Sequence, residues 1–155
     1  MSFERTEGEF MVSSDAKKLD LDVVHGFLKD CYWARGIPRA VVRRSLQNSL
    51  CFGVYHGRAQ VGFARVITDR ATFAYLADVF VLESYRKRGL AKFMMRCIMQ
   101  HPELQGLRRW SLLTRDAHQL YHQFGFKPLA RPEMWMELHN PDVYTRQTTN
   151  ESMSQ

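Results

Sequence analysis

Two periodicities of apolar residues divide the chain into strands and helices. Short alternating or continuous apolar runs predict strands at residues 10–13, 50–55, 60–67, 110–113, 126–129 and 134–138. Apolar residues spaced three and four apart predict helices at residues 20–36, 38–48, 90–100 and 117–124. Residues 73–82 are apolar on both faces, which is typical of a central strand covered on both sides. Antiparallel strands come first and helical crossovers follow, so the order predicts an α/β domain with a mixed sheet flanked by helices.

The distribution of apolar residues also indicates the domain boundaries. The chain has 155 residues, of which 45% are hydrophobic, and this suffices for one compact core. The sequence shows no internal repeat and no low-complexity block, so we expect a single domain at residues 1–145. Residues 146–155 carry almost no apolar side chain, and we expect a disordered tail there.

Composition bounds the compartment and the class of partner. An odd number of cysteines without a C-x-x-C pair indicates buried thiols in a reducing compartment: Cys31, Cys51 and Cys97. The sequence has no secretory leader pattern and no apolar run of about 18 residues, so we expect a cytoplasmic protein that makes no use of a membrane. The balance of 22 Lys+Arg against 16 Asp+Glu gives a net charge of +6, which favours anionic partners without choosing among them.

The most informative segment is residues 79–92, where a buried strand leads through a basic turn into a helix. Unpaired amides at a helix N-terminus attract anions, and Gly89 lets an anion approach the backbone closely. The turn adds three cationic side chains, those of Arg86, Lys87 and Arg88. A diphosphate is the natural ligand of such a site. The segment has neither the G-x-G-x-x-G fingerprint of a dinucleotide site nor the G-K-[ST] of a nucleoside triphosphatase.

Two motifs resemble those of the GNAT acetyltransferases. The family signature (Q/R)-x-x-G-x-(G/A) is matched by the six residues Arg86, Lys87, Arg88, Gly89, Leu90 and Ala91. The family segment A-x-x-L-Y-x-x-x-G-F is similar to residues 117–126, which contain Ala117, Leu120, Tyr121, Gly125 and Phe126. The two motifs have the separation and the element order of the family, and together they cover about residues 73–127.

The resemblance implies acetyl-CoA as the donor substrate. The backbone of residues 86–91 would hold its diphosphate, and the backbone of Val79, Phe80 and Val81 would pair with the pantetheine arm. A backbone N–H there would face the thioester carbonyl and stabilise the oxyanion. Thr114 stands where many relatives have an asparagine that contacts the CoA arm, but its hydroxyl is equally suited to cap the following helix.

The resemblance also implies two catalytic candidates. Tyr121 aligns with the tyrosine that protonates the departing thiolate in many family members, although its place on an apolar helix face also fits a core residue. Asp78 is the one carboxylate inside the central strand and is the candidate base for the incoming amine. A carboxylate held by structural hydrogen bonds is the competing interpretation. Tyr75 and Ala77 stand where other family members place a glutamate base.

The acceptor side is defined less sharply. Tyr32 and Trp33 lie in a region that borders the acceptor groove in this family, and an aromatic pair there suits an aliphatic or cationic acceptor as well as plain core packing. His118 and His122 are one helical turn apart, but no third ligand accompanies them, so we expect no metal site.

These observations predict an N-acetyltransferase in which an amine attacks acetyl-CoA directly in a ternary complex. The acceptor would be a small-molecule or peptide amine that the sequence does not identify. The sequence does not fix the oligomeric state, and a homodimer is one expectation because relatives are often dimers. Two alternatives remain at this point. One is a non-catalytic CoA-binding sensor on the same fold, and the other, less favoured, is a nucleic-acid-binding protein whose basic loops contact phosphates.

Overall fold

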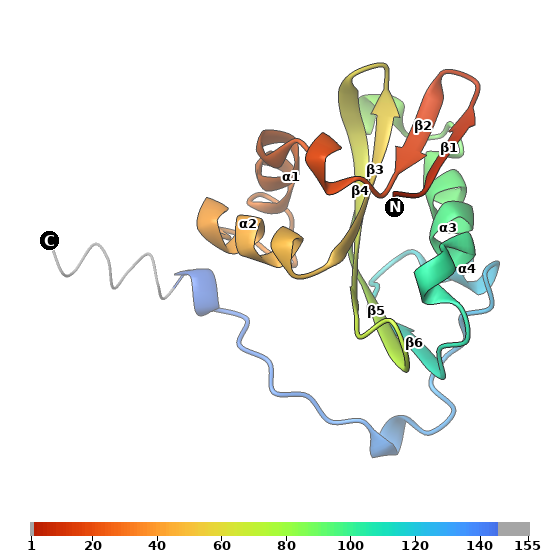
Figure 1. Cartoon of the computed structure of the whole chain (residues 1–155). Helices are drawn as coiled ribbons and strands as arrows, with labels where there is room; N and C mark the ends of the chain where they lie inside the picture. Colours follow the sequence, from red (N-terminus) through yellow and green to blue (C-terminus); the bar gives the residue numbers. More distant parts are fainter. Residues whose placement is uncertain (1, 146–155) are drawn as a thin grey trace, which may run out of the picture.

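A single six-stranded sheet organises the molecule (Figure 1), and the computed structural model describes it within residues 2–145. The strands lie in chain order and comprise β1 (Glu4–Glu7), β2 (Phe10–Ser13), β3 (Leu50–His56), β4 (Ala59–Thr68), β5 (Phe73–Val81) and β6 (Arg109–Leu112). The first five pair antiparallel, and β5 pairs parallel with β6. This arrangement confirms the mixed sheet that the sequence predicts.

Helices cover both faces of this sheet (Figure 1). One face carries α1 (Leu21–Leu28) and α2 (Arg39–Gln47), whereas α3 (Leu90–Gln100) and α4 (His118–His122) lie on the other. Four short 3-10 helices connect the larger elements: η1 (Ala16–Lys18), η2 (Glu83–Tyr85), η3 (Pro102–Leu104) and η4 (Pro132–Met134). No helix in the described part of the chain is long and apolar enough to cross a membrane.

The core consists of two apolar clusters, one on each face of the sheet. The cluster under α3 joins inward side chains of that helix, such as Met94, Met95 and Ile98, to one face of the strands. The other cluster lies under α1 and α2 and contains Phe63 and Phe80. Because central strands contribute to both clusters, they are apolar on both faces, as the continuous apolar run at residues 73–82 predicts.

Strand β1 and helix α1 differ from the sequence-based expectation. Strand β1 is missed by the sequence reading because three of its four residues are charged and its burial is slight. Helix α1 begins where Asp20 accepts hydrogen bonds from the amides of Asp22 and Val23, but it ends at Leu28 instead of continuing to residue 36. Turns follow, closed by a 2.8 Å bond from Gly36 N to Lys29 O. These turns place Trp33 beside the sheet. Tertiary contacts therefore decide the conformation of residues 29–36, although their apolar periodicity predicts a helix.

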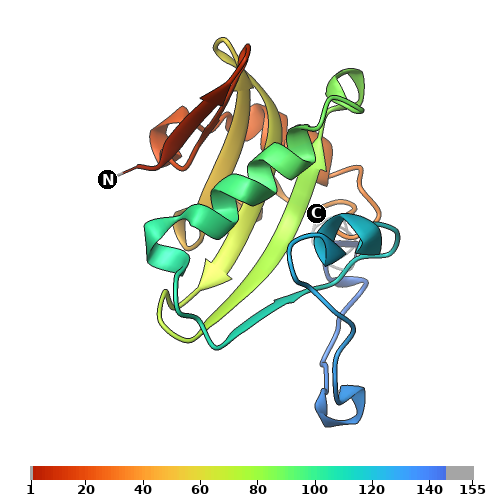
Figure 2. The ribbon, with the colours of Figure 1, turned by 90° about the vertical axis from the view of Figure 1, so that its right-hand side faces the viewer.

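The predictions of strands at residues 126–129 and 134–138 are wrong. Residues 126–138, called the C-terminal arm below, contain no strand and lead away from the sheet through η4 (Figure 2). A segment with alternating apolar residues forms a strand only when it pairs with the edge of another strand. The arm pairs with no strand within residues 2–145. The tail expected to be disordered at residues 146–155 lies outside the described residues.

Candidate active site

The basic turn before α3 presents a row of free backbone amides. Lys87 and Gly89 adopt left-handed backbone conformations, with φ of 64° and 74°, and Gly89 caps the helix without a side-chain bond. The first amide bonded in the helix is that of Phe93, which donates to Gly89 O at 3.0 Å. The backbone N–H groups of residues 87–92 donate no hydrogen bond to any acceptor among the residues that the structure describes. This turn therefore has the geometry of an anion-binding helix N-terminus.

The cationic side chains of this turn are arranged around the amides. Arg86 folds back so that its Nε donates to Val81 O at 3.0 Å, which ties the turn to the end of β5. The Arg88 guanidinium stands 5.3 Å from the centre of the Tyr85 ring. Both arginines and Lys87 remain exposed or nearly so, and they supply positive charge beside the helix N-terminus.

Strands β5 and β6 separate beside this turn. They pair only between Phe73–Leu76 and Arg109–Leu112, so the rest of β5 has one neighbour, β4. Leu82 N donates to Val61 O on β4, and strand amides alternate in direction, so the amides of Val79 and Val81 point to the open edge. The backbone of Phe80 faces β4, and its ring is stacked on Phe27 with centroids 4.0 Å apart. Two of the three residues expected to pair with a pantetheine arm thus offer their amides to that edge.

A β-bulge interrupts β5 at Asp78. Phe63 pairs with Phe80 and Arg65 with Ala77, so Ala64 alone faces both Asp78 and Val79. Asp78 takes a φ of 56°, a left-handed conformation that aspartate tolerates better than most residues. The bulge reverses the alternation of the strand, and it turns the carboxylate toward α1 and α2.

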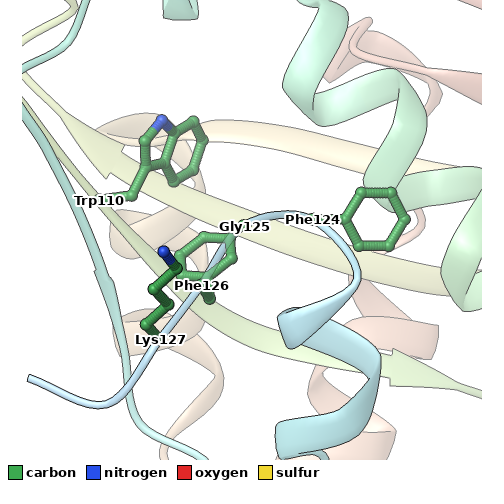
Figure 3. Close-up of a pocket in the computed structure, with 5 residues that line it drawn as sticks. All are labelled: Trp110, Phe124, Gly125, Phe126 and Lys127. Atoms are coloured by element: carbon green, nitrogen blue, oxygen red, sulfur yellow. The ribbon is translucent and has the colours of Figure 1, made fainter.

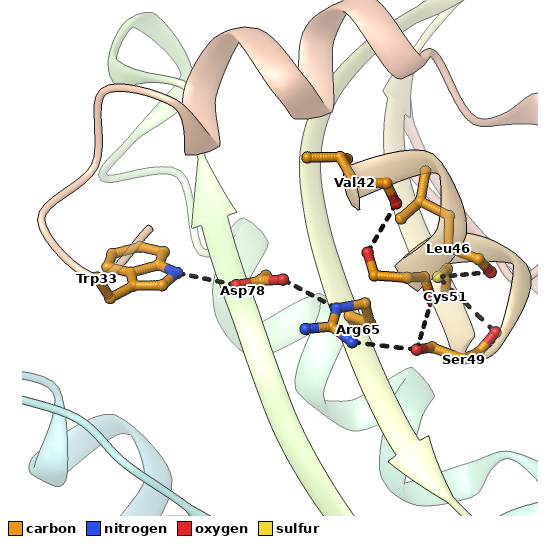
Figure 4. A network of polar contacts seen from close by, with 8 residues as sticks. Trp33, Val42, Leu46, Ser49, Cys51, Arg65 and Asp78 are labelled. Carbon is orange, nitrogen blue, oxygen red and sulfur yellow. Dashed lines mark hydrogen bonds and ion pairs between the residues drawn. The ribbon is translucent and has the colours of Figure 1, made fainter. Parts of the chain in front are cut away.

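Asp78 is held by side chains on both of its oxygens (Figure 4). Trp33 Nε1 donates to Oδ1 at 2.9 Å, and Arg65 Nε donates to Oδ2 at 2.9 Å. Arg65 is fixed in turn by a 3.2 Å bond from its guanidinium to Ser49 Oγ. The side chains of Asp78 and Arg65 are only 11% and 16% exposed, so the ion pair is largely shielded from water. Each oxygen of this carboxylate thus accepts a hydrogen bond from a neighbouring side chain.

Tyr121 is buried on α4 and belongs to the core cluster under α3. Burial, followed by the nearby Asp116 and Tyr32, raises the pKa of Tyr121 to about 12. Its ring meets Phe126 edge-on at 6.1 Å. The raised pKa keeps the phenol protonated at neutral pH, and its hydroxyl donates to no acceptor within residues 2–145.

Tyr32 and Trp33 lie side by side after α1, and Tyr32 contacts the loop that follows β6. Tyr32 is 51% exposed, and the Arg115 guanidinium lies 4.0 Å from its ring centre, although Arg115 follows β6 on the other side of the opening. Trp33 packs edge-on against Tyr32 and contacts Phe27. Thr114 Oγ1 accepts a 3.0 Å bond from Ala117 N and so caps the turn before α4, one of the two roles expected for it.

The sequence reading missed two charged residues of this region, Arg65 and Arg115. Arg65 is a lone charge inside the apolar run 60–67, and a charge there signals a buried partner on the next strand. Arg115 carries no comparable signal because its contact with Tyr32 depends on how α1 ends. Among the described residues no three His, Cys, Asp or Glu side chains gather as a metal site, and His122 Nδ1 lies 3.2 Å from Phe126 O.

Comparisons with known proteins agree on one family. The profile of the acetyltransferase (GNAT) domain matches residues 47–128. A protein of Gibberella zeae named as a candidate acetyltransferase is 32% identical over 139 residues, which are 75% of this chain and 77% of that protein. The crystal structure of a candidate GNAT acetyltransferase from Xanthomonas campestris pv. campestris shares 49% identity with a TM-score of 0.87, covering 90% of this chain and 99% of that one.

A more distant structure shows the same fold. A predicted acetyltransferase from Clostridium acetobutylicum, determined with acetyl-CoA, has a TM-score of 0.61 at 16% identity and covers 90% of this chain and 96% of that one. The matching profile and the shared fold thus define the class of the protein, an acetyltransferase-type domain. The chain belongs to the GNAT acetyltransferase family.

Proposed function

We propose that this protein transfers the acetyl group of acetyl-CoA to a primary amine by direct attack in a ternary complex. The observation that carries the proposal is the row of unbonded amides at residues 87–92, next to the open edge of β5. The amides, with Arg86, Lys87 and Arg88 around them, suit the diphosphate of coenzyme A. The related fold determined with acetyl-CoA is consistent with this donor.

The open edge of β5 suits the pantetheine arm of the donor. An extended chain of amides can add to a strand edge through backbone hydrogen bonds, and the amides of Val79 and Val81 are available there. One such amide beside the bulge would face the thioester carbonyl. In this role it stabilises the negative charge that develops on oxygen as the amine attacks. Phe80 supports this edge by packing and contributes no hydrogen bond to it.

Tyr121 is proposed to donate to the leaving thiolate. The amine nitrogen forms a bond with the carbonyl carbon and releases a proton to solvent, the carbon–sulfur bond breaks, and the sulfur takes up a proton or a strong hydrogen bond. Burial raises the pKa of Tyr121 to about 12, above the value near 8.5 of a free thiol, so complete transfer to sulfur is uphill. Tyr121 therefore acts mainly as a hydrogen-bond donor during bond cleavage, and solvent completes the protonation.

Asp78 is proposed to position residues of the acceptor side. Both of its oxygens are occupied, so we assign it to holding Trp33 and Arg65 and do not assign it as the base. Tyr32 and Trp33 form the wall along which the acceptor amine approaches. The chemistry of this wall leaves the acceptor within the broad class of amines, small molecules and peptides alike.

The state of the cysteines supports direct attack. Burial raises the pKa of Cys51 to about 12 and that of Cys97 to about 11. Both thiols are buried in the core clusters and stay protonated at neutral pH, so neither can carry the acetyl group as a thioester. The third thiol, Cys31, donates to Leu28 O at 3.1 Å, and its pKa is also raised by burial.

Release of CoA from acetyl-CoA across a panel of amines tests the proposed reaction. Amine-dependent release that requires the intact basic turn is the expected result. In Tyr121→Phe, turnover should fall about a hundredfold while acetyl-CoA affinity stays the same, because the ring is kept and only the donor is lost. Binding of acetyl-CoA with no release for any amine would favour a sensor. Nucleic-acid affinity that falls steeply with salt, without acetyl-CoA binding, would favour the phosphate-binding alternative.

A further inference from the structure

Arg115 carries a positive charge that its own chain leaves unpaired within residues 2–145. The side chain is exposed and forms no ion pair there, not even with Asp116, the next residue. It lies over the ring of Tyr32, with the guanidinium carbon 4.0 Å from the ring centre. A guanidinium over an aromatic ring contacts it with its flat face, and its five N–H groups point outward in its plane. Those donors are therefore free to bind an anion from outside.

Contacts on both sides of the opening between β5 and β6 hold this cation in place. Tyr32 meets Trp33 edge-on, with ring centroids 5.1 Å apart. Trp33 in turn donates to Asp78 at the bulge of β5, as Figure 4 shows. A chain of contacts thus runs from the bulge through two aromatic rings to Arg115, which follows β6. The guanidinium has a defined position across the opening, as a binding group for a small ligand requires.

The register of the strands places Arg115 at the level of the proposed reaction. Leu112 of β6 pairs with Leu76 of β5, and the two strands run parallel. Arg115 follows Leu112 by as many residues as Val79 follows Leu76. Both therefore lie at the level of the bulge, where the thioester is proposed to stand. A small molecule bound to Arg115 is within reach of the acetyl group.

The donor substrate does not account for this cation. The phosphates of acetyl-CoA and its thioester lie at opposite ends of the pantetheine arm. The basic turn at residues 86–89 and Arg115 would therefore meet different parts of the complex. The other arginine of the region, Arg65, already has Asp78 as its partner. Arg115 is thus available to the second reactant, the acceptor.

A hollow of about 270 Å³ offers a second place for an acceptor, but it lies away from the opening. Trp110 of β6 forms one wall, and residues 124–127 form the other (Figure 3). Trp110 pairs with Ala74, in the part of the sheet where β5 and β6 are still joined. Lys127 gives this hollow a positive charge. The hollow is therefore a competing site for an anion, and an experiment must distinguish it from Arg115.

We propose that the acceptor is a small amine that also carries a carboxylate, and that Arg115 binds this carboxylate through two parallel hydrogen bonds. The inference rests on the acetyl transfer proposed above and narrows its acceptor to amino acids and related aminocarboxylates. The planar guanidinium matches two carboxylate oxygens, and such charge-assisted pairs are stronger than neutral hydrogen bonds. The carboxylate stays unchanged in the reaction. The amine nitrogen bonds to the carbonyl carbon and loses a proton to solvent, the carbon–sulfur bond breaks, and the CoA sulfur takes up a proton.

Matched pairs of amines test the role of the carboxylate. Glycine, β-alanine and 4-aminobutyrate are compared with methylamine, ethylamine and propylamine, which lack only the carboxylate. At saturating acetyl-CoA, kcat/KM should be at least about tenfold higher for the aminocarboxylate of the best pair. In Arg115→Gln this ratio should fall to about one, mainly through KM, because a contact made already in the ground state is lost. Arg115→Lys, which keeps the charge but loses the planar fork, should give an intermediate ratio.

Two control variants locate the effect. Arg58→Gln removes an exposed arginine of the turn between β3 and β4, and Lys127→Gln removes the charge of the hollow. Both should keep the ratio of the natural protein. A natural protein without preference for the carboxylate overturns the proposal. A ratio that falls in Lys127→Gln and persists in Arg115→Gln would place the carboxylate in the hollow, and this result overturns it as well.

Binding without turnover separates this inference from the proposed reaction. With CoA in place of acetyl-CoA no acetyl group can be transferred, and an NMR titration then measures the affinity for the same three aminocarboxylates. Arg115→Gln should weaken this binding at least about tenfold. Binding that depends on Arg115, without CoA release for any amine, would leave the carboxylate site standing and refute the acetyl transfer. CoA release with the simple amines alone would support the transfer and refute the carboxylate site.

Discussion

Asp78 occupies the position of β5 where backbone conformation, charge and packing meet. The bulge demands a left-handed residue, and aspartate and asparagine are the non-glycine residues that adopt it most readily. The neighbouring Arg65, 16% exposed, demands a negative partner. Aspartate meets both requirements, whereas asparagine meets only the first. The residue therefore holds Trp33 and Arg65 in place through one indole hydrogen bond and one ion pair.

Replacing Asp78 with asparagine should separate these two requirements. The backbone conformation is kept, but Arg65 is left shielded from water without a counter-charge, so we expect a loss of about 2 kcal/mol in the free energy of unfolding. Urea denaturation measures it. The double variant Asp78→Asn with Arg65→Met should recover part of the loss, since the unpaired charge is gone. If the two substitutions simply add, the ion pair is not the source of the stability.

His101 introduces a pH dependence into the stability of the core. It is 3% exposed, its Nδ1 accepts from Glu103 N at 3.1 Å, and burial lowers its pKa below 6.5. Because the unfolded chain binds the proton more readily, stability is complete above about pH 6.5 and falls as the pH drops toward the folded pKa. His101→Asn keeps an acceptor for the Glu103 amide and removes the titration.

Thermal denaturation between pH 7 and pH 5 should therefore show a steeper loss in the natural protein than in His101→Asn. The comparison of slopes is the readout, since the substitution lowers stability at every pH by leaving space beside Phe52. Parallel curves would mean that His101 does not titrate in this range.

Individual residues could be predicted only where a motif or an isolated charge marked them. The sequence predicted Asp78 inside the central strand and Tyr121 on the apolar face of a helix, and the structure has Asp78 in β5 and a buried Tyr121 in α4. It could not show that Asp78 is paired to Arg65, because that contact depends on a bulge that shifts the register by one residue. It likewise could not show the contact between Tyr32 and Arg115, which are 83 positions apart, from the difference of their numbers.

At the scale of elements, the junction of η2 and α3 is the feature on which the proposed function rests. Gly89 has a φ of 74°, and a Cβ built on it would meet no protein atom within 4 Å. The glycine is therefore required by its conformation and not by crowding within the protein. A side chain there would be strained, and it would stand in the space that an incoming diphosphate is proposed to occupy.

Gly106 offers a matched control for this glycine. Its φ is 73°, and its Cβ position is also open to 4 Å, but it lies in the loop before β6. We expect Gly89→Ala and Gly106→Ala to lose similar stability, about 1 kcal/mol each, from the left-handed conformation. Only Gly89→Ala should weaken the binding of acetyl-CoA, by roughly tenfold, and titration calorimetry can measure this difference. Equal affinities in the two variants would contradict the proposed place of the diphosphate.

The elements with strong periodicity were predictable, and those that depend on partners were not. Helix α3 and strands β3 to β5 follow from their apolar patterns, since burial dominates their formation. The early end of α1 follows from the contact between Trp33 and Asp78, which lies outside any local window. The C-terminal arm has a strand pattern but no strand, because an edge to pair with is not supplied by sequence alone.

At the scale of the whole molecule, the sheet separates two sides of the proposed reaction. The donor would enter along the open edge of β5 and meet the basic turn at the α3 side, whereas Tyr32 and Trp33 stand at the α1 side. The bulge at Asp78 lies between them, near the proposed position of the thioester. A ternary complex therefore needs no movement of one domain against another.

Binding of acetyl-CoA should register as stability of the entire chain, since α3 and β5 belong to its main core cluster. At about 100 times the dissociation constant the ligand adds about 2.7 kcal/mol, which raises the melting temperature by about 5–10 °C for a domain of this size. Protein concentration must be held constant so that association of chains does not contribute. The shift in melting temperature should be larger with acetyl-CoA than with free acetate plus an equal concentration of sodium chloride. The reason is that the diphosphate and the pantetheine chain of acetyl-CoA bind together. No shift at millimolar acetyl-CoA would remove the donor substrate from the proposed reaction, whereas a shift that Gly89→Ala reduces and Gly106→Ala does not would place it at the start of α3.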